Sequence, residues 1–148
     1  MILRRSTIAL LSGAVLGLSV PGGPAGADIM SVCTSEIGSY CSGVREGRGR
    51  IAACLVSNID RLSGTCKPEV ETLAQRTSGN RMMPASVRKM LSPGFSAPLP
   101  QACTADAGQY CPEISQGDGR VFACLYAHES QVSQTCSAAA ETALDQAN

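Results

Sequence analysis

The sequence contains no tryptophan, and aromatic residues make up only 3% of its 148 residues. Few large side chains are therefore available to fill a hydrophobic core, and chains of this kind commonly need covalent cross-links to stay folded. The basic residues are sparse and have no aromatic neighbours, so the pattern of a nucleic-acid interface is missing as well. We expect a small core that depends on cross-links, and no nucleic-acid partner.

No cysteine stands outside a repeat. The cysteines form two sets of four, each with the spacing C-x7-C-x12-C-x11-C, and the second set follows the first at an offset of 70 residues. This arrangement is typical of two copies of one disulfide-bonded module. The first set is Cys33, Cys41, Cys54 and Cys66, and the second is Cys103, Cys111, Cys124 and Cys136.

Long hydrophobic runs are absent except at the start of the chain, where residues 8–20 are apolar. Arg4 and Arg5 precede this run, and a small-residue Ala-Gly-Ala stretch at 25–27 lies before Asp28. These features predict a secretory signal peptide over residues 1–27. The run of 13 residues is shorter than the roughly 20 that cross a bilayer. We expect an exported, periplasmic or secreted protein whose mature chain has no membrane span, in a compartment that permits disulfides.

Basic residues are almost missing from the second half of the chain. Residues 28–90 carry nine Lys or Arg and six Asp or Glu, whereas residues 91–148 carry one, Arg120, and six acidic residues. Such asymmetry would attract the two halves to each other, or two chains head to tail. A solvated surface whose charge has drifted explains it equally well. The expected partner is therefore an unknown protein or a second copy of this chain.

Strand-like alternation is absent, and apolar residues recur at helical spacing instead. In the first copy, Ile51, Cys54, Leu55, Ile59 and Leu62 fall on one face of an expected helix. The sequence predicts an all-α fold of two tandem, disulfide-stapled helical-hairpin modules with about three helices each. The expected ranges are 28–76 for the first repeat, 77–98 for a linker and 99–148 for the second repeat.

Caps and breakers predict where the helices begin. Pro68 suits the first position of the third helix of the first repeat, and Ser137 suits the cap of its counterpart. Asp118 is expected to cap the central helix of the second repeat. A short helix is expected over residues 85–91 of the linker. Three linker methionines are expected to cover apolar surface between the modules: Met82, Met83 and Met90.

Helical geometry restricts the disulfides. Cys33 and Cys41 are eight residues apart, about 12 Å along a helix, whereas a disulfide joins Cα atoms roughly 4.4–6.8 Å apart. In an antiparallel hairpin, Cys41 and Cys54 lie near the loop, and Cys33 and Cys66 lie near the open end. We predict nested pairs in both repeats: Cys33–Cys66 with Cys41–Cys54, and Cys103–Cys136 with Cys111–Cys124.

Both copies share a Gly-Arg-apolar-x-x-Cys-Leu run, GRIAACL at 49–55 and GRVFACL at 119–125, and a serine before the last cysteine. These stretches resemble the cysteine-rich repeat of the Golgi apparatus glycoprotein family, also described as the E-selectin ligand or cysteine-rich fibroblast growth factor receptor. The resemblance covers about residues 29–144 and implies a helical, disulfide-bonded, non-catalytic module. Large members carry many repeats and a membrane anchor, whereas two repeats and no anchor are expected here. Growth-factor or selectin binding is therefore not carried over.

The single histidine, His128, has Glu129 and Ser130 beside it in sequence. The side chains of neighbouring helix residues point apart, so adjacency in the sequence does not bring these three residues together as a catalytic relay. We expect a partly exposed surface histidine and no enzyme. A small hydrolase or inhibitor-like toxin with a polar site around His128 and Glu129 is the alternative in the catalytic class.

Metal and redox motifs are absent too. Structural zinc sites use close cysteine pairs, whereas the shortest spacing here is C-x7-C, and no C-x-x-C redox motif occurs. We expect no metal and no cofactor. A thiol-redox or metal-binding envelope protein remains the alternative to the leading interpretation, an exported non-catalytic module with a binding or structural role.

Two residue types recur at the same place in both copies. Arg50 and Arg120 begin the central helices, where they are expected to bond loop carbonyls or to pair with Glu36 and Asp106. The functional alternative is two equivalent cationic contact points for a partner. Tyr40 and Tyr110 are expected to pack over the disulfides with their hydroxyls at the surface, or to contact a ligand.

Overall fold

The computed structural model describes residues 28–77, 81, 83–92, 94–117 and 119–147. The predicted signal peptide (1–27) and the expectations for Met82 and Asp118 lie outside these residues. Within them the fold is all-helical and contains no strand. None of the helices so described has both the length and the apolar character that a bilayer crossing requires.

The two repeats fold into similar successions of short helices. The first repeat contains α1 (Ile29–Val32), α2 (Thr34–Tyr40), α3 (Arg50–Ser57), the 3-10 turn η1 (Ile59–Arg61) and α4 (Cys66–Thr77). The second contains the 3-10 turn η2 (Gln101–Cys103), α6 (Thr104–Tyr110), α7 (Arg120–Ala127) and α8 (Gln134–Gln146). The linker carries α5 (Ala85–Met90).

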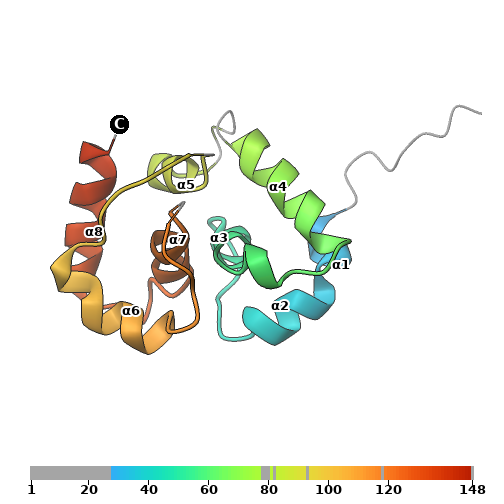
Figure 1. Cartoon of the computed structure of the whole chain (residues 1–148), viewed down its shortest axis with the longest axis horizontal. Helices are drawn as coiled ribbons and strands as arrows, with labels where there is room; N and C mark the ends of the chain where they lie inside the picture. Colours follow the sequence, from blue (N-terminus) through green and yellow to red (C-terminus); the bar gives the residue numbers. More distant parts are fainter. Residues whose placement is uncertain (1–27, 78–80, 82, 93, 118, 148) are drawn as a thin grey trace, which may run out of the picture.

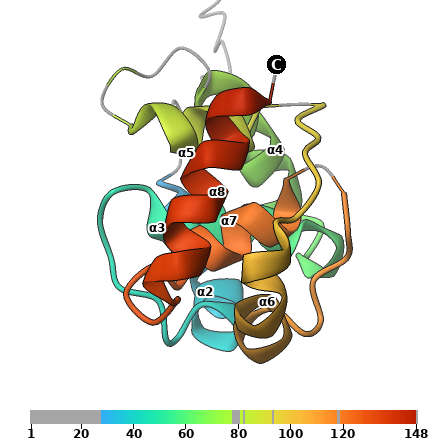
Figure 2. The same cartoon turned by 90° about the vertical axis from the view of Figure 1, so that its left-hand side faces the viewer.

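The two repeats lie side by side with their central helices in contact. In Figure 1, α3 and α7 occupy the middle, α8 lies on the left, α4 lies on the upper right, and α5 lies above α7. Figure 2, seen from the side of the second repeat, shows α8 in front of α7. The buried core is thus built from α3 and α7 and is closed by the linker on one side.

Four disulfides join helices within the repeats. Their Cα–Cα distances are 5.0 Å for Cys33–Cys66, 6.0 Å for Cys41–Cys54, 4.6 Å for Cys103–Cys136 and 6.1 Å for Cys111–Cys124. These are the nested pairs that the helical geometry predicts. No free cysteine is present among the described residues, and all eight cysteine side chains are buried.

Two expected helix starts are wrong, and one serine position explains both. Ser133 caps α8, because its hydroxyl accepts a hydrogen bond from the Cys136 N–H at 3.2 Å. Ser137 therefore lies inside the helix. In the first repeat the Ser63 hydroxyl accepts from the Cys66 N–H at 3.3 Å in the same way. Since α4 begins at Cys66, Pro68 is its third residue rather than its first.

The central helix is also shorter than its apolar pattern suggests. α3 ends at Ser57, and Ile59 belongs to η1. The Ser57 hydroxyl and the Asn58 side-chain amide both donate to the Cys54 carbonyl, at 2.7 and 3.0 Å. Such side-chain bonds compete with continued helix formation, so the chain leaves the helix while its apolar spacing continues.

Candidate functional site: the interface between the repeats

The interface between the repeats is formed by α3 and α7, and it contains the predicted contact residues. All seven residues that follow Arg50 in α3 are buried. Both helices begin after a glycine in the left-handed conformation, Gly49 with φ 79° and Gly119 with φ 69°. These glycines let the chain turn sharply into each helix, which brings the arginine at its first position back over the preceding loop.

The linker covers the start of both central helices. A Cβ built on Gly119 would lie 2.5 Å from Cδ1 of Phe95 and 2.6 Å from the Met90 carbonyl oxygen, whereas one on Gly49 would lie 3.2 Å from Cε of Met83. The rings of Phe95 and Phe122 also pack in a T-shaped arrangement, with their centroids 5.8 Å apart. Met90 thus covers apolar surface of both repeats, as expected, whereas Met83 packs at the start of α3.

Arg50 connects its own loop to the other repeat. Its Nε and Nη2 donate to the carbonyls of Arg45 at 2.9 Å and Glu46 at 2.7 Å. Its Nη1 lies 2.5 Å from Oε1 of Glu129. The loop-carbonyl role is therefore present, and the same guanidinium bridges the interface.

Arg120 makes the reciprocal connection. It donates to the loop carbonyls of Gly117 at 3.3 Å and Gln116 at 3.2 Å, and it pairs with Asp60 of the first repeat. The side chains of Arg50 and Arg120 are each only 15% exposed. Because both cations are engaged inside the molecule, they are poor contact points for an external partner.

The alternative pairing of these arginines with Glu36 and Asp106 is wrong. Both carboxylates are buried and accept hydrogen bonds from the serine that precedes the last helix of their repeat. Oε1 of Glu36 accepts the Ser63 N–H at 3.2 Å, and Asp106 accepts the Ser133 N–H at 3.0 Å and its hydroxyl at 2.7 Å. The Ser63 hydroxyl is the main cause of the lowered pKa of the Glu36 carboxyl.

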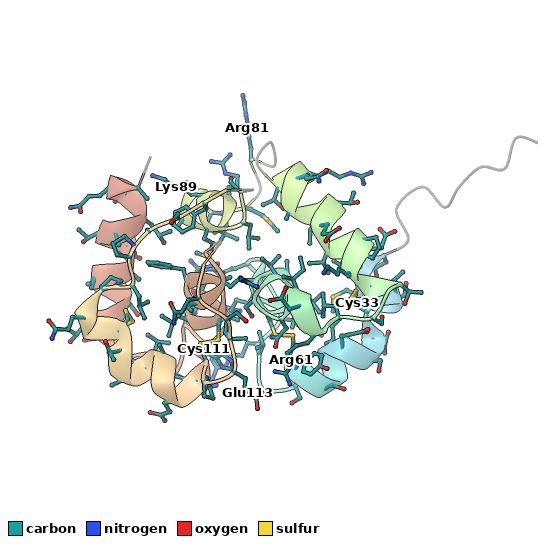
Figure 3. The ribbon with its side chains drawn as sticks, viewed as in Figure 1. Cys33, Arg61, Arg81, Lys89, Cys111 and Glu113 are labelled. Carbon is teal, nitrogen blue, oxygen red and sulfur yellow. A yellow bond between two sulfur atoms is a disulfide. The ribbon has the colours of Figure 1, made fainter. Side chains whose placement is uncertain are left out.

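The two tyrosines line a cleft of about 210 Å³ at the interface. Figure 3 shows Arg61, Cys111 and Glu113, which also line this cleft, on the side away from Lys89 of the linker. The hydroxyl of Tyr110 donates to the Gln131 carbonyl at 3.2 Å, and that of Tyr40 lies 3.5 Å from the Arg61 carbonyl. The Arg61 guanidinium lies 4.4 Å from the centre of the Tyr40 ring. Figure 3 shows Arg61 beside Glu113 of the second repeat, and their charged groups are 2.8 Å apart.

His128 also lines this cleft, where its ring stacks on Tyr110 at 5.7 Å. Burial lowers the pKa of its imidazole, and its Nδ1 is buried without a hydrogen-bond partner. Glu129 is engaged by Arg50 and by Arg48 at 3.7 Å rather than by the histidine. The carboxylate next to His128 in sequence therefore does not orient it for catalysis.

Apart from Arg50 and Arg120, the residues that join the repeats were not predicted as contact residues, because the prediction relied on positions that match between the copies. The phenolic hydroxyl of Tyr126 donates to the Arg48 carbonyl at 2.8 Å, and burial raises its pKa. The missed residues occupy positions where the copies differ, and that difference is the signal that could have found them: Arg48, Asp60, Arg61, Glu113, Tyr126 and Glu129.

The described residues contain no group of three or more His, Cys, Asp or Glu side chains that could hold a metal ion. No curated protein and no solved structure matches the chain. The family model described as a cysteine-rich repeat matches residues 88–133, which run from α5 to the cap of α8. The match covers 46 of the 148 residues, and it is consistent with the cysteine-rich repeat family that the sequence resembles.

Proposed function

We propose that the protein is an exported, non-catalytic binding module in which the two repeats act as a single unit. The reciprocal arginine pairs carry this proposal, because Arg50 reaches Glu129 and Arg120 reaches Asp60 across the interface. Two charge pairs of this kind, around a buried helix pair, fix the relative orientation of the repeats. A partner would then meet one continuous surface formed by both copies.

The disulfides support the setting of this proposal. All eight cysteines are paired in the described residues, and such cross-links persist in oxidising compartments outside the cytosol. The intact mass of the exported protein, measured with and without reduction before alkylation, tests this point. We expect no alkylation before reduction; alkylation of the native protein would favour the thiol-redox or metal-binding alternative.

A capture experiment tests the single-unit part of the proposal. The oxidised protein would be used as bait against extracellular or envelope extracts, beside a Glu129→Lys variant, which repels Arg50 across the interface, and an Asp145→Lys variant, which changes the same charge at an exposed position of α8. We expect a partner that is retained by Asp145→Lys and lost by Glu129→Lys. A partner that binds both variants equally would contradict the single-unit proposal.

A further inference from the structure

A cavity of about 130 Å³ lies beneath α5, between α7 and α8. Its floor is apolar and is formed by buried side chains that include Met90, Phe122, Leu125 and Leu144. Figure 2 shows the three helices that surround it. An engineered protein cavity of roughly 150 Å³ with a similar apolar lining takes up benzene. The volume therefore suits one small apolar group and excludes a drug-sized molecule.

The rim of this cavity receives a cation from the other repeat. Arg48 lines the cavity, and its backbone adopts the left-handed conformation with φ 52°, between Gly47 and Gly49. A non-glycine residue in this conformation is strained and is found where surrounding contacts enforce it. The contact here is the hydrogen bond from the Tyr126 hydroxyl to the Arg48 carbonyl, and Tyr126 is itself a cavity residue.

The Arg48 guanidinium has capacity for a further anion. Its side chain is 66% exposed, and it lies 3.7 Å from Glu129, a carboxylate that Arg50 already holds at 2.5 Å. Glu129 is thus neutralised by the more buried arginine. The other carboxylate on the rim, Glu141, is exposed to solvent, where water and salt screen its repulsion.

We propose that this cavity binds a carboxylate attached to a small apolar group, with the apolar group inside and the carboxylate on Arg48. The inference deepens the proposed binding function, since it names a ligand class for the joined repeats. Two sources share this chemistry: a free short-chain acid, and the C-terminal residue of a polypeptide that ends in a leucine-sized side chain.

The first repeat offers an internal comparison. A hollow of about 260 Å³ lies in the related place, lined by Val56, Ile59 and Ala74, and it also reaches Met90 and Arg120. The cation there is already bound to Asp60 and to its own loop carbonyls. The same ligand is therefore expected to prefer the cavity of the second repeat.

The direct test is an NMR titration of the oxidised full-length mature protein with isocaproate and with the corresponding alcohol. We expect shift changes centred on α7, α8 and the 47–49 loop, with a dissociation constant on the order of 1 mM for so small a ligand. The alcohol is expected to bind at least about tenfold more weakly, because it lacks the charge-assisted bonds to the guanidinium. A peptide with a free C-terminal leucine, beside its amidated form, distinguishes the two sources.

Variants separate this site from adventitious binding. Arg48→Asn keeps a residue that tolerates the left-handed backbone and is expected to weaken isocaproate binding by at least about tenfold. Arg48→Lys is expected to retain most of it, and Ala140→Leu, which fills the cavity, is expected to abolish it. Arg45→Asn removes an exposed charge from the same loop and serves as the matched control.

Specific outcomes overturn the inference. They are no shift changes with either the acid or the peptides, changes centred elsewhere in the wild-type protein, or equal binding by the wild type and Arg48→Asn. The wild-type shift map remains decisive even if Ala140→Leu fails to fold. The proposed binding function would survive these outcomes if a partner were still captured in a manner that depends on Glu129.

Discussion

Nη1 of Arg50 lies 2.5 Å from Oε1 of Glu129, which is 79 residues further along the chain. The arginine is the first residue of α3, and the glutamate follows the end of α7. The pair thus joins the start of one central helix to the end of the other. Arg120 and Asp60 repeat this relationship in the opposite direction, which gives the interface an approximate two-fold symmetry.

A double-mutant cycle on this pair should show strong coupling. The side chains of Arg50 and Glu129 are 15% and 27% exposed, so water weakens their interaction less than at an open surface. We expect Arg50→Met and Glu129→Gln to show a coupling of about 1–2 kcal/mol in urea unfolding. The matched control is Arg61 with Glu113, whose side chains are 40% and 70% exposed; its coupling should stay below about 0.5 kcal/mol. Equal couplings would contradict a special role for the buried pair.

The two helix-start glycines should respond differently to alanine. At Gly119 an added Cβ meets a backbone oxygen at 2.6 Å and a ring carbon at 2.5 Å, whereas at Gly49 it meets the flexible end of Met83 at 3.2 Å. Both positions also carry the strain of a positive φ. We expect Gly119→Ala to lower the free energy of unfolding by about 3 kcal/mol or more and Gly49→Ala by about 1 kcal/mol. Chemical unfolding of both variants measures the difference, and a larger loss at Gly49 would be inconsistent with how the linker covers the helices.

Removing either disulfide of a repeat should destabilise it by an amount that follows the loop it closes. The sequence separation is 33 for Cys33–Cys66 and 13 for Cys41–Cys54. The chain-entropy model gives losses of roughly 4 and roughly 3 kcal/mol respectively. Paired cysteine-to-alanine variants, compared by urea unfolding, test this order. The second repeat, with the same two separations, provides an independent replicate.

Acid should weaken the fold in two steps. Burial lowers the pKa of His128 below 6.5, so the unfolded chain binds a proton first, and stability falls as pH drops from that value through the folded pKa. The pKa of Glu36 is also lowered in the folded protein, from its ordinary value of 4.5, so the unfolded chain again binds a proton first. Stability therefore falls a second time at lower pH. Thermal unfolding against pH should show both steps. His128→Asn, which installs the residue of the first repeat, should remove only the first step; an unchanged profile would contradict this assignment.

The repeat pattern allowed the helical fold and the nested cysteine pairs to be predicted from sequence, because matching residues build each repeat internally. The matching residues Ser63 and Ser133 make the same hydrogen bond in both copies, although the sequence analysis did not predict this capping role. The docking of the repeats could not be predicted in the same way. It depends on residues that differ between the copies, such as Val56 against Tyr126 and Ile59 against Glu129. The effect of these differences is evident only once the two central helices are known to face each other.

The contact between Arg48 and the second repeat could not be predicted from the sequence either. From sequence, Arg48 is one cation in a glycine-rich loop. Its importance comes from a left-handed backbone and a hydrogen bond from Tyr126, 78 residues away. Short-range sequence patterns report capping, periodicity and cysteine spacing, whereas a contact of this kind requires the tertiary arrangement.

Every disulfide closes within its own repeat, and the interface between α3 and α7 is entirely noncovalent. Each central helix packs its apolar face against the other, so an isolated repeat would expose an apolar face to water. A third copy added to this chain by duplication would have no further central helix against which to pack. A longer array that uses this interface would therefore contain an even number of repeats. The pair, rather than the single repeat, would be the unit that selection maintains.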